Sequence, residues 1–145
     1  VAALFTLVTN HIDNRVALRE AGAVESLVRL LEDADDARLP AVENATAILA
    51  SIATNSEANK DAVTRAGAIP YLVHLLKGAD VYPAKRNAVV ALMVLAHGHV
   101  SNRNLIRESG AIGLLVPLLR CGPEEVITEK AIWALGNLSQ GNDYN

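Results

Sequence analysis

This chain contains few of the residues that cross-link or stiffen a small protein. Of its 145 residues one is cysteine and 3% are aromatic. The single cysteine, Cys121, excludes a disulfide within the chain and fits a reducing compartment. Because aromatic side chains are scarce, any core must be built from Leu, Val, Ile and Ala, which suits closely packed helices.

The chain also lacks an excess of positive charge and any long apolar segment. Its net charge is −3, so its composition favours neither a nucleic acid nor an anionic membrane as the partner. No apolar segment approaches the ~20 residues that span a bilayer, and the first residues lack the layout of a signal peptide. We therefore expect no nucleic-acid or membrane partner, and a cytoplasmic or nuclear location.

What the sequence does contain is a tripeptide, Gly-Ala-(Val/Ile), that occurs three times and opens a Leu-rich segment each time. The glycines are Gly22, Gly67 and Gly110, which lie 45 and then 43 residues apart. A period in this range, with matching apolar positions, is typical of a helical solenoid and not of one globular core.

Each repeated unit is predicted to form three helices. The first is short and ends at the glycine, which takes the left-handed conformation that turns the chain into the second, Leu-rich helix. The third is longer and has Ala at one or two of the four positions of its apolar stripe, so that neighbouring helices can approach closely. The predicted first helices are 14–21, 59–66 and 102–109, and the third helices are 40–53, 83–96 and 124–139.

We treat residues 1–145 as a single domain of such units. They are divided into the tail of a preceding repeat (1–10) and three repeats (11–55, 56–99 and 100–145). The chain starts without Met, and residues 1–8 align with the third helices, so we expect it to be a segment of something longer.

The two ends of this repeat array are predicted to be apolar. Leu4 and Leu7 at one end, and positions around Leu135 and Leu138 at the other, would lack a neighbouring repeat. Because repeat proteins need polar terminal caps, we expect self-association of the isolated segment through its uncapped ends.

Two stretches show a specific family pattern. Residues 59–76 have the sequence NKDAVTRAGAIPYLVHLL, and residues 131–139 have the sequence AIWALGNLS. Both resemble the armadillo repeat, and the resemblance covers the whole chain. It implies an all-α fold, a right-handed α-solenoid of armadillo repeats with three helices per repeat. It also implies a concave groove, lined by the third helices, that binds a protein or peptide partner as in importin-α and β-catenin.

The same resemblance implies which residues would contact a partner. In the family, an Asn on each third helix hydrogen-bonds the backbone of an extended peptide, and a Trp four residues earlier stacks on its side chains. Trp133 and Asn137 match this pair. The equivalent residues are Val90 and Val94 in the second unit and Ala47 and Ser51 in the first. One turn earlier on the same face are Glu43, Arg86 and Glu129, whose charges suggest a mixed or basic ligand.

One matching Trp–Asn pair is too few to hold a peptide along the whole groove as importin-α does. The apolar middle of the groove suits a partner helix or loop at least as well. We therefore expect a protein–protein interaction scaffold. The alternative is a purely structural solenoid segment that couples neighbouring domains of a longer protein.

No motif in the chain indicates catalysis or a cofactor. His97-Gly98-His99 has no third metal ligand near it in the sequence, and the acidic stretch at 32–36 lacks the spacing of a cation-binding loop. We expect no enzyme activity, no metal and no cofactor. One irregularity is predicted: Pro117 lies inside a second helix, so we expect a bend or an irregular turn near Gly113.

Overall fold

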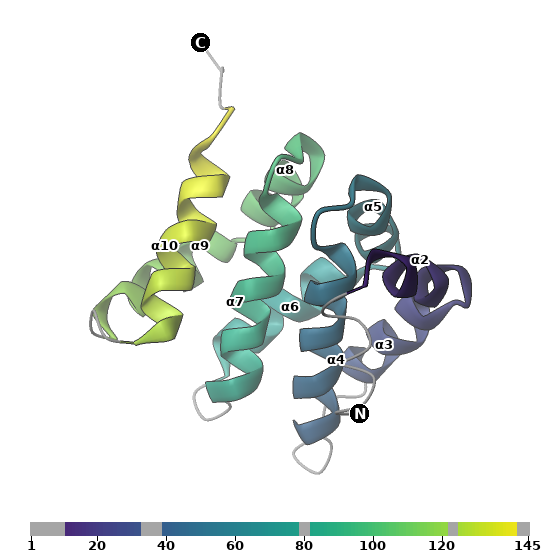
Figure 1. Ribbon diagram of the computed structural model, residues 1–145. Helices are drawn as coiled ribbons and strands as arrows, with labels where there is room; N and C mark the ends of the chain where they lie inside the picture. Colours follow the sequence, from purple (N-terminus) through teal and green to yellow (C-terminus); the bar gives the residue numbers. More distant parts are fainter. Residues whose placement is uncertain (1–10, 33–38, 79–81, 122–124, 142–145) are drawn as a thin grey trace.

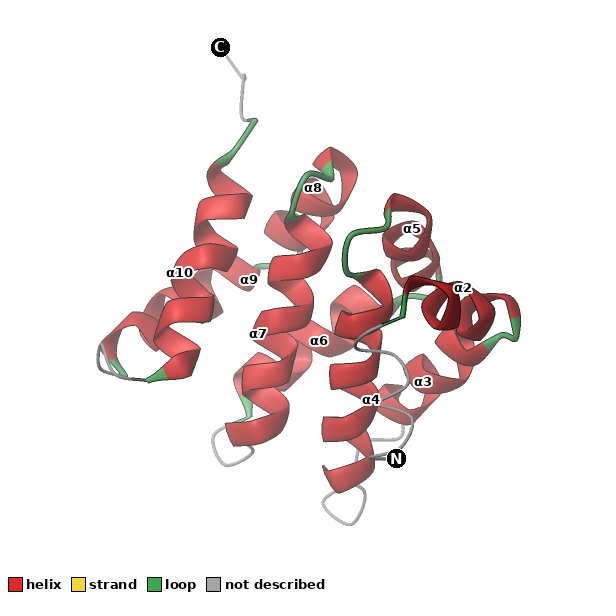
Figure 2. Cartoon of the chain, in the orientation of Figure 1, coloured by secondary structure: helices red, strands yellow, loops and turns green. Residues whose placement is uncertain are grey.

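The structure is a computed structural model that describes residues 11–32, 39–78, 82–121 and 125–141. In these ranges every regular element is a helix (Figure 2). None of the described helices is both long and apolar enough to cross a membrane. The predicted helix at 1–8, its residues Leu4 and Leu7, and most of the acidic stretch at 32–36 fall outside the described residues.

Each of the three units contains a short first helix, a second helix and a long third helix, as predicted (Figure 1). In the first unit these are α2 (Ile12–Glu20), α3 (Ala23–Glu32) and α4 (Leu39–Ala53). In the second they are α5 (Glu57–Arg65), α6 (Ala68–Lys77) and α7 (Tyr82–Ala96). In the third they are α8 (Val100–Glu108), α9 (Ala111–Leu115) with the 3₁₀ helix η2 (Val116–Arg120), and α10 (Val126–Ser139).

The units stack side by side, so helices of the same rank form rows. The third helices α4, α7 and α10 form one row, in which α7 packs against both α4 and α10 (Figure 1). The second helices lie behind them, and α6 contacts both α3 and α9. Buried apolar residues of all three units form one continuous cluster, as expected for stacked repeats. The exact repeat boundaries that we gave stay a prediction.

The repeated glycines have the backbone conformation that the sequence predicted. Gly22, Gly67 and Gly110 have φ angles of +74°, +83° and +79°. A Cβ atom built on Gly67 or Gly110 would meet nothing within 4 Å. Glycine is therefore favoured at these positions by the left-handed backbone of the turn between the first and second helices, and not by a lack of space for a side chain.

The small residues of the third helices are buried where these helices meet. Ala45, Ala88 and Ala131 are all fully buried. Larger residues of the same stripe, such as Leu49 and Leu92, are buried beside them. The burial of these residues confirms the predicted stripe. Ala at the contact lets the helix backbones approach, while Leu and Ile fill the space between the rows.

Two buried asparagines tie the second and third units to the unit before them. The side-chain amide of Asn59 donates to the carbonyl of Ile52 at 2.9 Å, and that of Asn102 donates to the carbonyl of Leu95 at 3.1 Å. Both carbonyls lie in the last turn of a third helix, where the backbone has no helical partner. The asparagines therefore satisfy acceptors that would otherwise be buried without a hydrogen bond.

Buried cations satisfy further carbonyls at the ends of the third helices. Arg15 Nη1 donates to the carbonyls of Ser51 and Thr54 at 3.3 and 3.1 Å, and Lys60 Nζ donates to the carbonyl of His97. Positive charge near a helix C-terminus also interacts favourably with the helix dipole. These contacts explain why two charged side chains of short first helices are buried.

One exposed contact links the second helices. The hydroxyl of Tyr71 on α6 donates to Glu32 Oε1 on α3 at 2.6 Å. This hydrogen bond to a carboxylate raises the pKa of the Tyr71 phenol, because it stabilises the protonated form.

Pro117 interrupts the second helix of the third unit, as predicted. The α-helix ends at Leu115, and the chain continues as the tighter 3₁₀ helix η2. The irregular segment begins at Val116, whereas we expected it near Gly113, which lies inside α9. The proline lacks an N–H and its ring crowds the carbonyl four residues earlier, so the change in winding occurs beside the ring itself.

At the C-terminal end, two residues that we expected to lack a neighbour are not exposed, whereas the expected self-association stays a prediction. Leu138 is buried as part of the apolar core, and Leu135 is partly buried against that core. The exposed apolar side chains of this unit lie at other positions, including Ile132 on α10.

Candidate functional site

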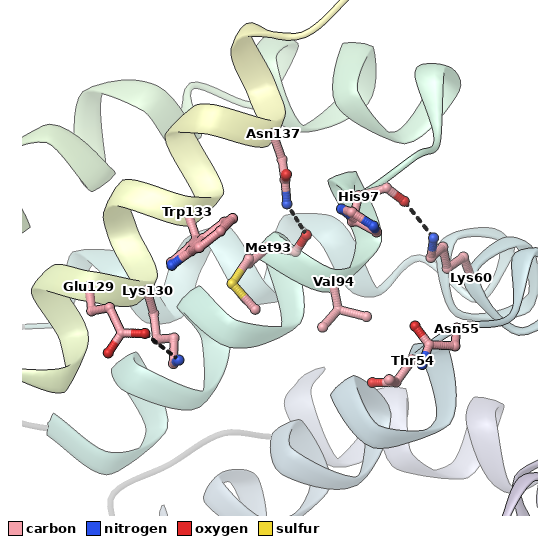
Figure 3. Close-up of a pocket in the computed structure, with 10 residues that line it drawn as sticks. All are labelled: Thr54, Asn55, Lys60, Met93, Val94, His97, Glu129, Lys130, Trp133 and Asn137. Carbon is pink, nitrogen blue, oxygen red and sulfur yellow. Dashed lines mark hydrogen bonds and ion pairs between the residues drawn. The ribbon is translucent and has the colours of Figure 1, made fainter.

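The row of third helices contains two neighbouring hollows, which we call the third-helix groove. The larger has a volume of about 440 Å³ and lies between α7 and α10, with the ends of α4 and α5 at its edge. It is lined by Thr54, Asn55, Lys60, Met93, Val94, His97, Glu129, Lys130, Trp133 and Asn137 (Figure 3). The smaller, of about 150 Å³, lies between α4 and α7 and is lined by Ala47, Ala50, Ser51, Thr54, Asn87 and Val90.

Trp133 is the most accessible large apolar side chain of the larger hollow. It projects from α10 and is 61% exposed. An indole in this position offers a wide apolar face and a ring that attracts a cation. The side chain can therefore contact a ligand without moving a neighbouring helix.

Asn137, one turn after Trp133, is held differently. It is buried, and its Nδ2 donates to the carbonyl of Met93 on α7 at 3.0 Å (Figure 3). This bond uses one of the two N–H donors of the carboxamide. In this structure the predicted peptide-binding asparagine also joins two third helices.

The charges of the larger hollow occur in pairs. Glu129 Oε1 lies 2.9 Å from Lys130 Nζ, and the buried Lys60 Nζ lies 2.9 Å from Glu57 Oε1. The Glu129–Lys130 pair is partly exposed, so solvent screens it and it opens easily. The hollow is thus amphipathic and has no strong excess of either sign.

The smaller hollow is mostly apolar, and its polar groups bond to the helices themselves. The amide of Asn87 donates to the carbonyl of Glu43 at 3.1 Å, and the hydroxyl of Ser51 donates to the carbonyl of Ala47 at 3.0 Å. These bonds satisfy polar atoms within or between α4 and α7. What remains for a ligand is mainly the apolar surface of residues such as Ala47 and Val90.

The structure places most of the predicted groove residues in these hollows. Trp133, Asn137, Glu129 and Val94 line the larger one, and Val90, Ala47 and Ser51 line the smaller one. The remaining two, Glu43 and Arg86, are partly buried and line neither.

The sequence prediction missed several lining residues of the larger hollow. Thr54 and His97 follow the predicted positions Ser51 and Val94 by one helical turn, so a longer helical face would have found them. Lys60 comes from α5, and no local pattern in the sequence connects it to the third helices.

His99 lies outside the groove and is used in the fold. Its Nδ1 accepts from the backbone N–H of Asn102 at 3.2 Å, which caps α8, and its Nε2 lies 2.9 Å from Asp61 Oδ1. Among the described residues, no group of three or more His, Cys, Asp or Glu side chains could hold a metal ion.

Comparison with known proteins shows where this architecture belongs. The sequence profile of the Armadillo/beta-catenin-like repeat matches residues 55–96 and 99–140. A search of curated proteins found no match. Among solved structures, computationally designed armadillo repeat proteins for modular peptide recognition share 32% identity and a TM-score of 0.85, over 97% of this chain and 57% of theirs.

Two more solved structures have a similar fold. A designed armadillo repeat protein in complex with the peptide (KR)4 shares 30% identity and a TM-score of 0.82, over 94% of this chain and 55% of that one. An engineered protein shares 29% identity and a TM-score of 0.83, over 94% of this chain and 53% of its own. The chain thus spans a little more than half the length of these structures. It belongs to the armadillo repeat family, and its fold is an all-α solenoid of armadillo repeats.

Proposed function

We propose that this chain is a protein–protein interaction scaffold that binds a segment of a protein or peptide partner in the third-helix groove. The observation that carries the proposal is the exposed Trp133 at a hollow of about 440 Å³, with a second hollow beside it along the same row of helices. A solved armadillo relative in complex with the peptide (KR)4 supports this function.

The groove chemistry supports a segment with a basic side chain next to apolar ones. A Lys or Arg of the partner would lie on the indole of Trp133, where the ring attracts the cation and covers its aliphatic stem. Glu129 would exchange its pairing with Lys130 for the incoming charge. The apolar surface of Val90 and Ala47 in the smaller hollow would take an apolar side chain.

A titration with the peptide (KR)4 tests this proposal. Trp133 is the single Trp of the chain, so a change in its emission reports binding at the groove directly. We expect Trp133→Ala to weaken binding by roughly 5- to 30-fold in calorimetry, which corresponds to ~1–2 kcal/mol for a cation–π contact.

The matched control is Ile132→Ala, because Ile132 is similarly exposed on the same helix but does not line either hollow. It should leave the affinity unchanged. Equal losses in both variants, or no binding of any basic or amphipathic peptide by the unchanged chain, would reject the groove as the site.

The competing hypothesis is a structural segment that couples neighbouring domains of a longer protein. The bond between Asn137 and Met93 favours it, because this asparagine already joins two helices. Under that hypothesis, changing Trp133 and Val94 together alters no interaction of the full-length protein in a pull-down.

We further propose a binding role without catalysis, a partner that is neither nucleic acid nor membrane, and a cytoplasmic or nuclear location.

A further inference from the structure

The two hollows of the third-helix groove form one continuous strip, because Thr54 lines both of them. Most of the surface that this strip offers is apolar. Its apolar lining residues are Ala47, Ala50, Val90, Met93, Val94 and Trp133. They come from α4, α7 and α10, so one occupant can contact all three third helices.

The hydroxyl groups that line the strip already donate to the protein itself. Ser51 donates to the carbonyl of Ala47 at 3.0 Å, and Thr54 donates to the carbonyl of Ala50 at 2.9 Å. Each hydroxyl has a single O–H. Neither of them therefore has a second proton to give to a ligand.

The carboxamides of Asn87 and Asn137 are partly used in the same way. Nδ2 of Asn87 donates to the carbonyl of Glu43 at 3.1 Å, and Nδ2 of Asn137 donates to the carbonyl of Met93 at 3.0 Å. Each carboxamide retains one further N–H. These two groups lie on different helices, α7 and α10, and they are too few to pair with the backbone of a segment along the whole strip.

Among the described lining residues, those in the middle of the strip have no polar side-chain atom for a ligand backbone. Val94 occupies on α7 the position that Asn137 has on α10, and Val90 lies one turn before it. An extended segment exposes a carbonyl and an N–H at each residue, and a carbonyl buried here without a donor would lower the affinity. An α-helix satisfies these groups internally and presents side chains alone.

Charged side chains lie beside the apolar strip at its α10 end. Figure 3 shows Glu129, Lys130 and Trp133 on one side of the larger hollow, opposite Asn55 and Lys60. The side chain of Glu129 is 59% exposed, and Trp133 is 61% exposed. A basic side chain at the edge of a helix's apolar face can lie on the indole with its charge near Glu129.

We propose that the third-helix groove takes its partner segment as an amphipathic α-helix. The apolar face of this helix lies over Ala47, Val90 and Val94, and a basic residue at its edge lies on Trp133. The proposal rests on the proposed function of the groove, to which it adds the conformation and the side-chain pattern of the partner.

The first test compares two peptides of about 18 residues, a length at which a helix can form. The first peptide has Leu at every third or fourth position and Lys or Ala elsewhere. The second has Thr in place of three Ala residues on the face away from Leu. Thr lowers helix propensity but favours extended backbone. We therefore expect the Thr peptide to bind roughly tenfold more weakly in calorimetry. Equal or tighter binding of the Thr peptide would overturn the proposal.

The second test changes the middle of the strip with Val94→Asn. This substitution should weaken the Ala peptide by roughly fivefold, because an apolar contact is lost. It should not weaken the peptide (KR)4, whose backbone gains a hydrogen-bond partner. The matched control is Val100→Asn, since Val100 is exposed on α8 and lines neither hollow, and it should change neither affinity. Tighter binding of the Ala peptide to the Val94→Asn variant would contradict a helical partner.

Failure of this proposal can be told from failure of the proposed function. If Trp133→Ala weakens both peptides, yet the Thr peptide binds the unchanged chain as tightly as the Ala peptide, the groove binds an extended segment and only the helix proposal is wrong. If neither peptide nor (KR)4 changes the emission of Trp133, the proposed function is wrong and the helix proposal fails with it.

Discussion

At the scale of single residues, the buried asparagine of each first helix is the clearest polar determinant of stacking. The carboxamide of Asn102 donates to the carbonyl of Leu95 and accepts from Thr64, so it joins three helices of two units. A buried polar group in this position stabilises the stack only while all its hydrogen-bond partners are in place, since a buried acceptor without a donor lowers stability.

We predict that Asn102→Ala lowers the free energy of unfolding by about 2–3 kcal/mol, because the Leu95 carbonyl and the Thr64 hydroxyl both lose a partner. Urea denaturation followed by circular dichroism measures the effect. Ser101→Ala is the control, since Ser101 is exposed on the same helix, and it should change stability by less than about 0.5 kcal/mol. Similar values for both variants would contradict this role.

The groove residues also differ from one another in how accessible their side chains are. Trp133 and Asn137 were predicted together from one family motif, yet Trp133 is accessible and Asn137 is buried against α7. Residue type and spacing placed both on the groove side of α10. Whether a side chain of α10 faces a ligand or a neighbouring helix depends on how closely α7 approaches α10. The sequence of a single unit does not contain that distance.

At the scale of elements, the second helix of the third unit shows how one residue changes winding. Pro117 lies at the start of η2, and the α-helix before it is only Ala111–Leu115. The corresponding helix α6 in the second unit extends without interruption from Ala68 to Lys77. It contains Pro70, but in its first turn, where the missing N–H would have no helical partner.

We predict that Pro117→Ala restores α-helical winding and raises the free energy of unfolding by about 1 kcal/mol, after allowance for the greater freedom of the unfolded chain. Far-ultraviolet circular dichroism and urea denaturation measure helix content and stability. Pro70→Ala is the matched control and should increase neither by a comparable amount. A loss of stability in Pro117→Ala would show that neighbouring units require the 3₁₀ geometry.

At the scale of the whole molecule, stability should vary along the stack. Repeat units pack mainly on their neighbours, so α7 is held on both sides, by α4 and α10, whereas among the described third helices α10 packs mainly against α7. Local opening of α10 therefore exposes less apolar surface than opening of α7.

We predict that native-state hydrogen exchange finds the slowest amides in α7 and an opening free energy for α10 lower by at least ~2 kcal/mol. Mass-spectrometric exchange with peptide-level resolution is sufficient, and α4 gives an internal comparison. The same protection in α7 and α10 would indicate that the three units unfold as one cooperative block.

Much of this molecule could be predicted because local signals repeat. The left-handed glycines, the Leu-rich second helices and the Ala-containing third helices each follow from short-range chemistry, and three copies in register reinforce one another. The buried cations Arg15 and Lys60 could not be predicted in this way, because their acceptors lie 36 to 39 residues later in the chain.

The sequence by itself determined the units, their helices, the turn at each glycine and the interruption at Pro117. These features depend on backbone preferences and on apolar periodicity within about twenty residues. Only the tertiary structure decided which side chains of the third helices remain accessible and which carbonyls Asn59 and Asn102 satisfy. Those properties depend on the distance between stacked units, because burial and hydrogen bonding are made by groups that are far apart in the chain.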